Sequence, residues 1–304
     1  MGERHSKSEV SEQINDRSSD MDAMNSLEIL QLMNDEDHAI MPALKKALPD
    51  IAQAVDIIVD RFRIGGRLIY VGAGTSGRLA AIDALECPPT FGTSPEQVSF
   101  LLAGGPEAFL APIEGAEDDE EAAARELLAL ELTSNDCVVA LSASGSTPYC
   151  IGALKYAAGL GAATISVSCN QETVMGKFSD LSIEVIVGPE LLAGSTRLKA
   201  GTAQKIVLNM LSTASMIRTG HVYRNMMVDM QPSNSKLKRR AVQIVREATG
   251  AGQEESELAL QRADWRIKTA VVSLLANVTP EEAEELLHRS DGFVRLAVRT
   301  DMQK

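Results

Sequence analysis

Two short loops rich in glycine and hydroxyl side chains could bind an anion. The first is Gly72–Gly77 (GAGTSG), which follows the apolar run Leu68–Val71 and precedes an Ala- and Leu-rich run. A strand, a glycine loop and a helix in this order direct backbone N–H groups and the positive end of a helix dipole at one point. Thr75 and Ser76 would add hydroxyl donors where the anion sits, and Gly74 would line the site.

The second loop is Ser142–Thr147 (SASGST), which follows an apolar run and opens a predicted helix. Ser142, Ser144 and Thr147 place several hydroxyl groups beside the free N–H groups of that helix. The alternative is a simple helix cap, which Ser146 or Thr147 could provide alone. Two such loops converging on one anion would form an uncharged cradle suited to a phosphomonoester.

A third polar segment, Gly188–Lys205, leads into the long helix predicted at about 197–219. It contains Glu190, Ser195, Thr196 and Lys199. Ser195 and Thr196 could simply cap that helix. The residue types leave open whether Glu190 and Lys199 line a site or lie on the surface.

The first loop has the GxGxxG spacing of a dinucleotide site, but the rest of that site is missing. A dinucleotide-binding unit needs an acidic residue near the end of its second strand to hold the ribose. Here the second predicted strand, Val98–Leu102, is followed by Ala-Gly-Gly-Pro106. The sequence therefore favours a small phosphorylated ligand over NAD or FAD, and predicts no cofactor.

Short apolar runs alternate with helical patterns over much of the chain. Strands are expected at Leu68–Val71, Val98–Leu102, Cys137–Leu141, Ala163–Ser168 and Leu181–Val187, and helices at about 106–113, 117–131, 148–160 and 197–219. The helix after the glycine loop should end at Glu86, because Pro88 and Pro89 follow. Such alternation predicts an α/β fold with a parallel sheet covered by helices on both faces.

The two ends of the chain differ from this middle part. Residues 1–20 are polar and predict a loosely held tail, followed by two amphipathic helices within 24–59 that could pack on the sheet or on a second subunit. From about residue 236 only helical patterns remain. We therefore expect one domain at 1–235, with its core at about 57–220, and a small all-helical domain at 236–304.

The composition of the chain limits the classes of binding partner and the cellular compartment that can be expected. The formal net charge of the 304 residues is −13, which disfavours nucleic-acid and anionic-membrane binding. No apolar run approaches the ~20 residues of a membrane helix, and the N-terminus lacks the apolar segment of a signal peptide. The four scattered cysteines favour reduced thiols over disulfides or a metal site. A cytoplasmic protein without a bound metal is expected.

The motifs resemble those of a known family. GAGTSGR and SASGST resemble the loops of the SIS (sugar isomerase) domain, which binds phosphosugars without metal or nucleotide. Four longer motifs resemble those of the N-acetylmuramic acid 6-phosphate etherases: LECPPTFG at 85–92, AGGPEAF at 103–109, EGAEDD at 114–119 and GSTRLKAGTAQK at 194–205. The glucokinase regulatory proteins share the motif at 194–205. The tail resembles a ubiquitin-associated-like fold. Ser146 stands where many members have Arg, which leaves open its contact with ligand.

The resemblance implies a flavodoxin-like SIS fold and a lyase. It implies cleavage of the D-lactyl ether of N-acetylmuramic acid 6-phosphate, in peptidoglycan amino-sugar recycling. The family's two glutamates map onto Glu86, the proton donor, and Glu117, the base, although the sequence does not separate Glu117 from Glu114. A homodimer with its site near the subunit interface is expected. A phosphosugar isomerase, a non-catalytic phosphosugar sensor and a transcriptional regulator are the alternatives.

Overall fold

The computed structural model describes residues 10–301, which divide into two compact units. The first unit holds the described residues up to Ala84 together with Glu96–Leu211. The second holds Leu85–Pro95 and the described residues from Ser212 on, and so contains the predicted helical tail. In the described part of the chain, no helix combines the length and apolar character needed to cross a membrane.

A five-stranded parallel sheet forms the centre of the first unit. Its strands are β1 (Leu68–Gly72), β2 (Val98–Leu102), β3 (Cys137–Leu141), β4 (Ala163–Ser168) and β5 (Leu181–Glu184). They lie in the order β2-β1-β3-β4-β5, which is the flavodoxin-like order. Gly72 pairs with Leu102 on one side and with Leu141 on the other, so three strands end level with one another.

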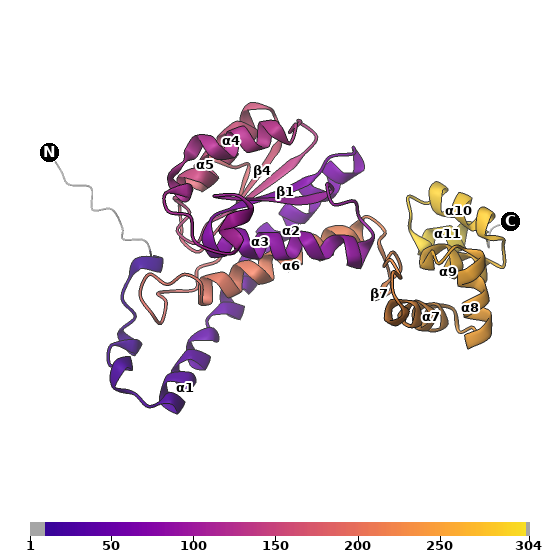
Figure 1. The fold of residues 1–304 in the computed structure, drawn as a ribbon, viewed down its shortest axis with the longest axis horizontal. Helices are drawn as coiled ribbons and strands as arrows, with labels where there is room; N and C mark the ends of the chain where they lie inside the picture. The colour runs from indigo at the N-terminus through magenta and orange to yellow at the C-terminus, as the bar shows by residue number, and fades with distance from the viewer. Residues whose placement is uncertain (1–9, 302–304) are drawn as a thin grey trace. The chain divides into compact units, whose positions relative to one another are not determined.

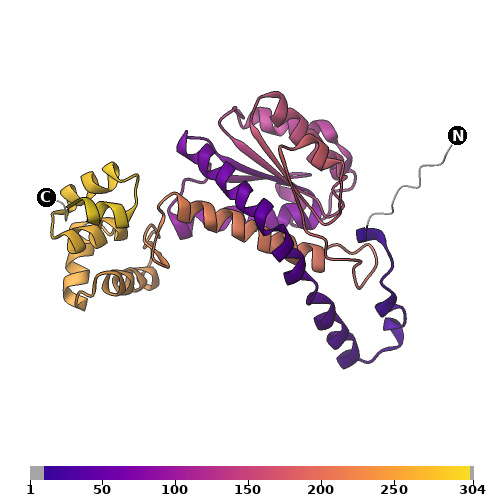
Figure 2. The same cartoon turned by 180° about the vertical axis from the view of Figure 1, so that it is seen from behind.

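Helices cover both faces of this sheet, which confirms the predicted fold class (Figures 1 and 2). Helices α4 (Glu120–Ala129) and α5 (Pro148–Gly159) cover one face, and α2 (Ile40–Arg63), α3 (Gly74–Phe91) and α6 (Lys199–Arg218) the other. The strand residues alternate accordingly. Ile69, Val71, Val138 and Ala140 belong to the core beneath α4 and α5. Between them, Tyr70 points the other way, and its hydroxyl donates to Asp83 of α3 over 3.1 Å.

The predicted helix at 106–113 is wrong, and the one at 117–131 starts later than predicted. The first is only a 3₁₀ turn, η4 (Pro106–Phe109). The second begins at Glu120, because the Asp119 carboxylate accepts hydrogen bonds from the N–H groups of Glu121 and Ala122 in the first turn of α4. Glu117 therefore lies in a separate 3₁₀ turn, η5 (Ala116–Asp118), rather than in the first turn of a helix.

Helix α3 does not end at Glu86 as predicted but continues through Pro88 and Pro89 to Phe91. Each proline removes one backbone hydrogen bond of the helix. Two features hold the turn in place. The side chains of Cys87 and Phe91, one turn apart, are buried, and the N–H of Gly92 donates to the carbonyl of Pro88 over 2.9 Å.

The N-terminal segment is better ordered than the predicted loose tail, whose residues 1–9 lie outside the described residues. From Val10 it forms three short 3₁₀ turns, η1 (Val10–Glu12), η2 (Asp16–Ser18) and η3 (Met21–Ala23). Ser11 and Asn15 are buried, so the described part of this segment is fixed to the first unit.

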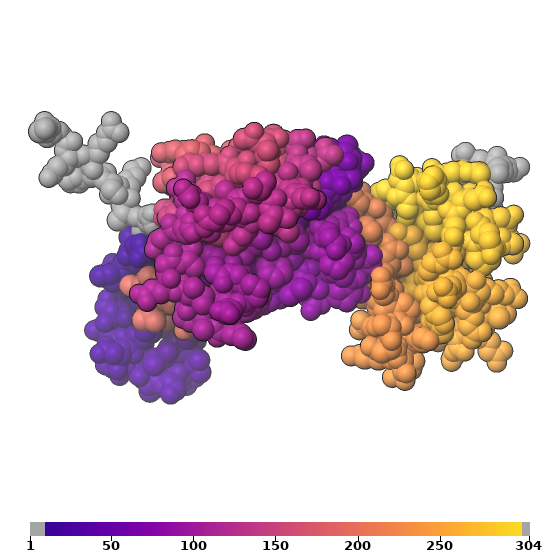
Figure 3. Space-filling view, turned by 45° about the horizontal axis from the view of Figure 1, so that its top comes forward, coloured from indigo at the N-terminus to yellow at the C-terminus, as the bar shows by residue number. Residues whose placement is uncertain are grey.

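Helix α1 (Ser26–Asp37) projects from the layers of the first unit (Figures 1 and 3). It begins with a capping box in which Asn25 and Glu28 bond to each other's backbone N–H groups. Its apolar face is exposed to solvent: Leu27 and Leu30 keep 64% and 61% of their surface. Of the two predicted N-terminal helices, α2 packs on the sheet, against β5 and β3.

The second unit is helical after a short hairpin. The hairpin pairs β6 (Val222–Tyr223) with β7 (Met226–Met227). Five helices follow: α7 (Ser235–Thr249), α8 (Gln253–Arg262), α9 (Ile267–Ala276), α10 (Pro280–Arg289) and α11 (Val294–Asp301). They enclose their own apolar core, as the helical patterns after residue 236 predict.

A buried ion pair joins the starts of β1 and β3. Asp136 is only 2% exposed and accepts hydrogen bonds from the backbone and the guanidinium of Arg67 and from Thr133. Burial alone would raise the pKa of Asp136, but these hydrogen bonds outweigh it and hold the pKa below its ordinary 3.8. The ionised carboxylate therefore stabilises the fold above that pH, and the contribution is lost as the pH falls through the folded-state pKa.

Asp136→Asn should lower the free energy of unfolding of the first unit by about 3 kcal/mol, because it leaves Arg67 without its charged partner. It should also lessen the loss of stability as the pH falls below about 4. Urea unfolding followed by far-UV circular dichroism measures both. The exposed pair of Asp60 and Arg63 provides the control, since Asp60→Asn should change stability by less than about 0.5 kcal/mol. Equal effects of the two substitutions would contradict the assignment.

Candidate active site

The topology gathers three loops at one edge of the sheet. They follow β1, β2 and β3, which are neighbours and end level with one another. In this strand order the chain turns in opposite directions after β1 and after β3, which opens a crevice between their carboxyl ends. The glycine loop and the hydroxyl loop predicted from the sequence flank that crevice.

The glycine loop is short because the backbone of Gly77 packs directly against the backbone of Gly72. A side-chain carbon on Gly77 would lie 2.5 Å from the carbonyl oxygen of Gly72, so only glycine lets the first turn of α3 approach β1 this closely. Ser76, two residues after the helix starts, is buried and donates a hydrogen bond to Gln204 of α6 over 2.8 Å. Thr75 is partly exposed. Ser76 thus has a partner inside the fold, and its contact with phosphate stays a prediction.

The hydroxyl loop folds so that its oxygens meet one another. The Oγ of Ser142 lies 2.7 Å from the Oγ1 of Thr147 and 3.1 Å from the Oγ of Ser144. Ser146 donates to Ser144 over 2.9 Å. Thr147 is the N-cap residue of α5, yet its side chain makes no capping hydrogen bond. The structure therefore brings Ser142, Ser144 and Thr147 together at the helix N-terminus and leaves the capping alternative unfulfilled.

Asn170 holds this loop, and the sequence analysis missed it. Its Nδ2 donates to the carbonyl oxygens of Ala143 and Ser144, and to the Oγ of Ser11 over 2.9 Å. Its Oδ1 accepts the N–H of Ser11 over 3.2 Å. Asn170 follows the end of β4, so a search for polar residues after every strand would have found it. The N-terminal segment is thereby tied to the hydroxyl loop.

The loop after β2 closes over the glycine loop and forms a pocket of about 580 Å³. Its lining consists of Ala73, Gly74, Arg78, Ala103, Ala108, Pro112, Ile113, Glu114, Gly115, Ala116, Glu117 and Asp118. The pocket brings together the predicted Gly74 and Glu117, and η5 packs against α5. Glu114 and Glu117 are both exposed and both line the pocket, so the lining does not show which of them is the base.

Arg78, on the first turns of α3, fastens this loop and was also missed. Its Nε and Nη2 both donate to the carbonyl oxygen of Ala108, over 3.0 and 2.7 Å. Phe109 adds an edge-to-face contact with Phe100 of β2. Arg78 is the only basic residue among the residues lining this pocket. It is the last residue of the GAGTSGR motif, and that position was the available signal.

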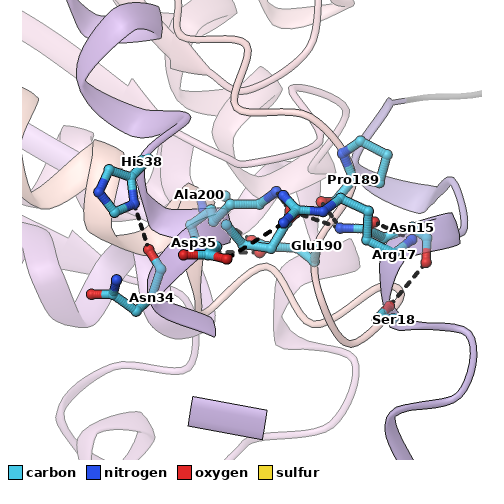
Figure 4. Close-up of polar contacts among 11 residues, drawn as sticks. Asn15, Arg17, Ser18, Asn34, Asp35, His38, Pro189, Glu190 and Ala200 are labelled. Atoms are coloured by element: carbon cyan, nitrogen blue, oxygen red, sulfur yellow. Dashed lines mark hydrogen bonds and ion pairs between the residues drawn. The ribbon is translucent and has the colours of Figure 1, made fainter. Parts of the chain in front are cut away.

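In the third segment, a carboxylate and not a hydroxyl caps the long helix (Figure 4). Glu190 is 1% exposed and accepts hydrogen bonds from the N–H groups of Lys199 and Ala200 over 3.0 and 2.9 Å. Ser195 and Thr196 do not fill this position. Burial raises the pKa of Glu190 although these hydrogen bonds oppose the shift.

Lys199 is also buried, and its ammonium group donates to Glu36 of α1 over 2.6 Å. Burial would raise the pKa of Glu36, but hydrogen bonds from Lys199 and Asn15 and the charge of Arg17 lower it. Figure 4 shows Asn15 and Arg17 entering this network from the N-terminal segment. Glu190 and Lys199 thus have structural partners, and a substrate-lining role stays a prediction for them, as for Ser195 and Thr196.

Glu86 lies on an exposed part of α3. Ile82 and Leu85 on the same helix are also exposed, with 54% and 60% of their surface accessible. Twelve residues separate Gly74 from Glu86, which corresponds to a rise of about 18 Å along an α-helix. Within the described part of the chain, Glu86 forms no hydrogen bond or ion pair with another side chain.

The four cysteines are buried. Burial raises the pKa of Cys137, Cys150 and Cys169 to about 12, so these thiols stay protonated at neutral pH. Between residues 10 and 301 there is no group of three or more His, Cys, Asp or Glu side chains that could hold a metal ion.

Family models match most of the chain. The model of the glucokinase regulatory protein N-terminal SIS domain matches residues 50–158, and the SIS domain model matches residues 116–214. The model of the C-terminal lid domain of glucokinase regulatory protein matches residues 224–270. The first two matches cover the sheet and the loops at its carboxyl edge, as the resemblance of the two loops implied.

Curated relatives are similar over nearly the full length. A Geobacillus thermodenitrificans protein named N-acetylmuramic acid 6-phosphate etherase is 53% identical over 95% of this chain and 98% of its own length. Proteins with the same name from Mycolicibacterium smegmatis and Bacillus subtilis are 51% and 49% identical, over 93% and 95% of this chain and 95% of their own lengths. With such identity from end to end, this chain belongs to the N-acetylmuramic acid 6-phosphate etherase family.

Proposed function

We propose that this protein is a carbon–oxygen lyase that cleaves the D-lactyl ether of N-acetylmuramic acid 6-phosphate. The products are N-acetylglucosamine 6-phosphate and D-lactate, which suits peptidoglycan amino-sugar recycling. The observation that carries the proposal is the identity of about half of all positions with relatives of that name along nearly the whole chain. The pocket lining supports it with the carboxylates Glu114 and Glu117 beside Gly74 of the glycine loop.

The chemistry requires an acid and a base. An alkyl ether resists direct hydrolysis, but in the open-chain sugar the C2 proton is α to the aldehyde and the ether oxygen is on C3. A base removes the C2 proton, an acid protonates the departing lactate oxygen, and water then adds to the unsaturated aldehyde. Two carboxyl groups in different environments can supply both functions. We assign Glu86 as the acid and Glu117 as the base.

The hydroxyl loop is the proposed phosphate site. Ser142, Ser144 and Thr147 surround the N-terminus of α5, where free N–H groups and the helix dipole favour an anion. Thr75 and Ser76 complete the cradle from the glycine loop, with Gly74 giving access to the backbone. These ligands carry no charge, which allows a strongly acidic protein to bind a phosphate locally.

Ser144→Ala should raise the KM for the phosphosugar by about tenfold with little change in kcat, because it removes a hydroxyl donor that binds substrate and transition state equally. Steady-state kinetics of D-lactate release measure both constants. Ser134→Ala is the control, since Ser134 is exposed and precedes β3 at the opposite edge of the sheet. An unchanged KM in Ser144→Ala would contradict the phosphate assignment.

We further propose a homodimer whose site lies near the subunit interface. The rise of about 18 Å from Gly74 to Glu86 along α3 exceeds the length of one sugar phosphate, so a site that uses both residues needs Glu86 from a second subunit. Exposed apolar residues beside Glu86 and along α1 support association, as such surfaces often mark contacts between proteins. Cytoplasmic action is proposed because none of the four cysteines forms a disulfide.

A D-lactate assay tests the function directly. Purified protein incubated with N-acetylmuramic acid 6-phosphate should release D-lactate and N-acetylglucosamine 6-phosphate in equal amounts. Binding without turnover would instead indicate a phosphosugar sensor. Aldose–ketose interconversion of a sugar phosphate without lactate release would indicate an isomerase.

A further inference from the structure

We propose that Arg78 binds the carboxylate of the lactyl group and thereby selects muramic acid phosphates over other amino-sugar phosphates. This inference rests on the proposed function, because the lactyl carboxylate distinguishes the substrate from the product sugar. N-acetylmuramic acid 6-phosphate carries two anionic groups, the phosphate and this carboxylate. The hydroxyl loop accounts for the first, and the second needs a partner of its own.

Charge in the pocket points to Arg78. The lining residues include three carboxylates, Glu114, Glu117 and Asp118, and one cation, Arg78. A substrate carboxylate that enters among three like charges is repelled unless a cation meets it. No ion pair joins Arg78 to a carboxylate among the described residues. Its charge is therefore available to a ligand.

The hydrogen bonds of Arg78 leave the Nη1–Nη2 edge of its guanidinium free to bind a carboxylate. The Nε and Nη2 atoms share the carbonyl oxygen of Ala108, which fixes the plane of the group. Among residues 10–301, Nη1 has no hydrogen-bond partner in the protein, and Nη2 retains a second N–H. These donors form the end-on edge of the guanidinium, which binds a carboxylate through two parallel hydrogen bonds.

The position of Arg78 also suits the elimination of lactate. Arg78 lines the same pocket as Glu117, the proposed base at C2. The lactyl group is attached at C3, the neighbouring carbon, so its carboxylate would lie close to the site of proton removal. A guanidinium held there by Ala108 would orient the ether for elimination without taking part in proton transfer.

The lactyl amide of N-acetylmuramic acid 6-phosphate tests the proposal, because it keeps the shape and loses the charge. Wild-type kcat/KM should favour the acid over the amide by about 10- to 100-fold, the value of a charged hydrogen-bonded pair. Arg78→Gln should reduce this preference to near unity. Arg78→Lys should retain part of it, since lysine keeps the charge and loses the two-pronged geometry.

Two controls separate recognition from a structural effect. Arg125→Gln alters an exposed arginine of α4 that pairs with Asp119 and Glu121, outside the pocket lining, and should leave the preference at the wild-type value. Inhibition by N-acetylglucosamine 6-phosphate, which has no lactyl group, should be unchanged in Arg78→Gln. A retained preference for the acid, or an equal loss of affinity for this sugar, would overturn the proposal.

Failure of the proposed function would look different. If the wild-type protein releases no D-lactate, the etherase activity is refuted. Calorimetric binding of the acid and the amide to wild-type protein and to Arg78→Gln then still reports on Arg78. A wild-type preference for the acid that disappears in the variant supports carboxylate binding, and equal affinities in the wild type refute it.

Discussion

Glu86→Gln should lower the rate of D-lactate release by about 100-fold or more, the scale of general acid catalysis. Glutamine has nearly the same shape but cannot donate a proton to the departing lactate oxygen. Glu86 is exposed on α3, so the change should leave the fold intact. Steady-state kinetics with N-acetylmuramic acid 6-phosphate measure the loss.

A substrate with a better leaving group separates an acid role from a binding role. An analogue with fluoride in place of lactate at C3 needs much less help from a proton donor. Glu86→Gln should therefore eliminate fluoride at a rate close to that of the wild type. Glu121→Gln is the control for a change of charge, because Glu121 is exposed on α4 and outside the pocket lining. Equal losses with lactate and fluoride would contradict the assignment of Glu86 as the acid.

The sheet was predictable because its signals are local. Buried parallel strands such as Cys137–Leu141 read as short continuous apolar runs, and the structure confirms this strand with the predicted bounds. Leu181–Val187 was predicted too long, since the paired strand ends at Glu184. The clustering of Ser142, Ser144 and Thr147 was predictable for the same reason, since all three lie in one tight loop.

The features that the sequence did not predict depend on tertiary contacts between residues far apart in the chain. Pro88 predicts a helix end from backbone chemistry alone, but burial of Cys87 and Phe91 and the bond to Gly92 keep α3 continuous. The contact of Arg78 with Ala108 joins residues thirty positions apart. The tie between Ser11 and Asn170 spans 159 positions. No local pattern encodes partners at such distances.

Glu117→Gln should also reduce D-lactate release by about 100-fold or more, but through loss of the base. The diagnostic reaction is exchange of the C2 hydrogen of the sugar with deuterium from solvent, which the base carries out without an acid. Glu86→Gln should retain this exchange and Glu117→Gln should lose it. Glu114→Gln is the matched control, because Glu114 lines the same pocket three residues earlier. Loss of exchange in Glu114→Gln alone would transfer the base role to Glu114.

The two inactive variants together test where the site is completed. If Glu86 and Glu117 of one site come from different subunits, a mixed dimer of Glu86→Gln and Glu117→Gln contains one site with both glutamates intact. Random reassociation of equal amounts should then restore about a quarter of the wild-type activity, since half of the dimers are mixed and each has one working site. If both glutamates come from one subunit, every site in the mixture lacks one of them. Activity that stays at the level of the single variants would therefore place the acid and the base in the same chain.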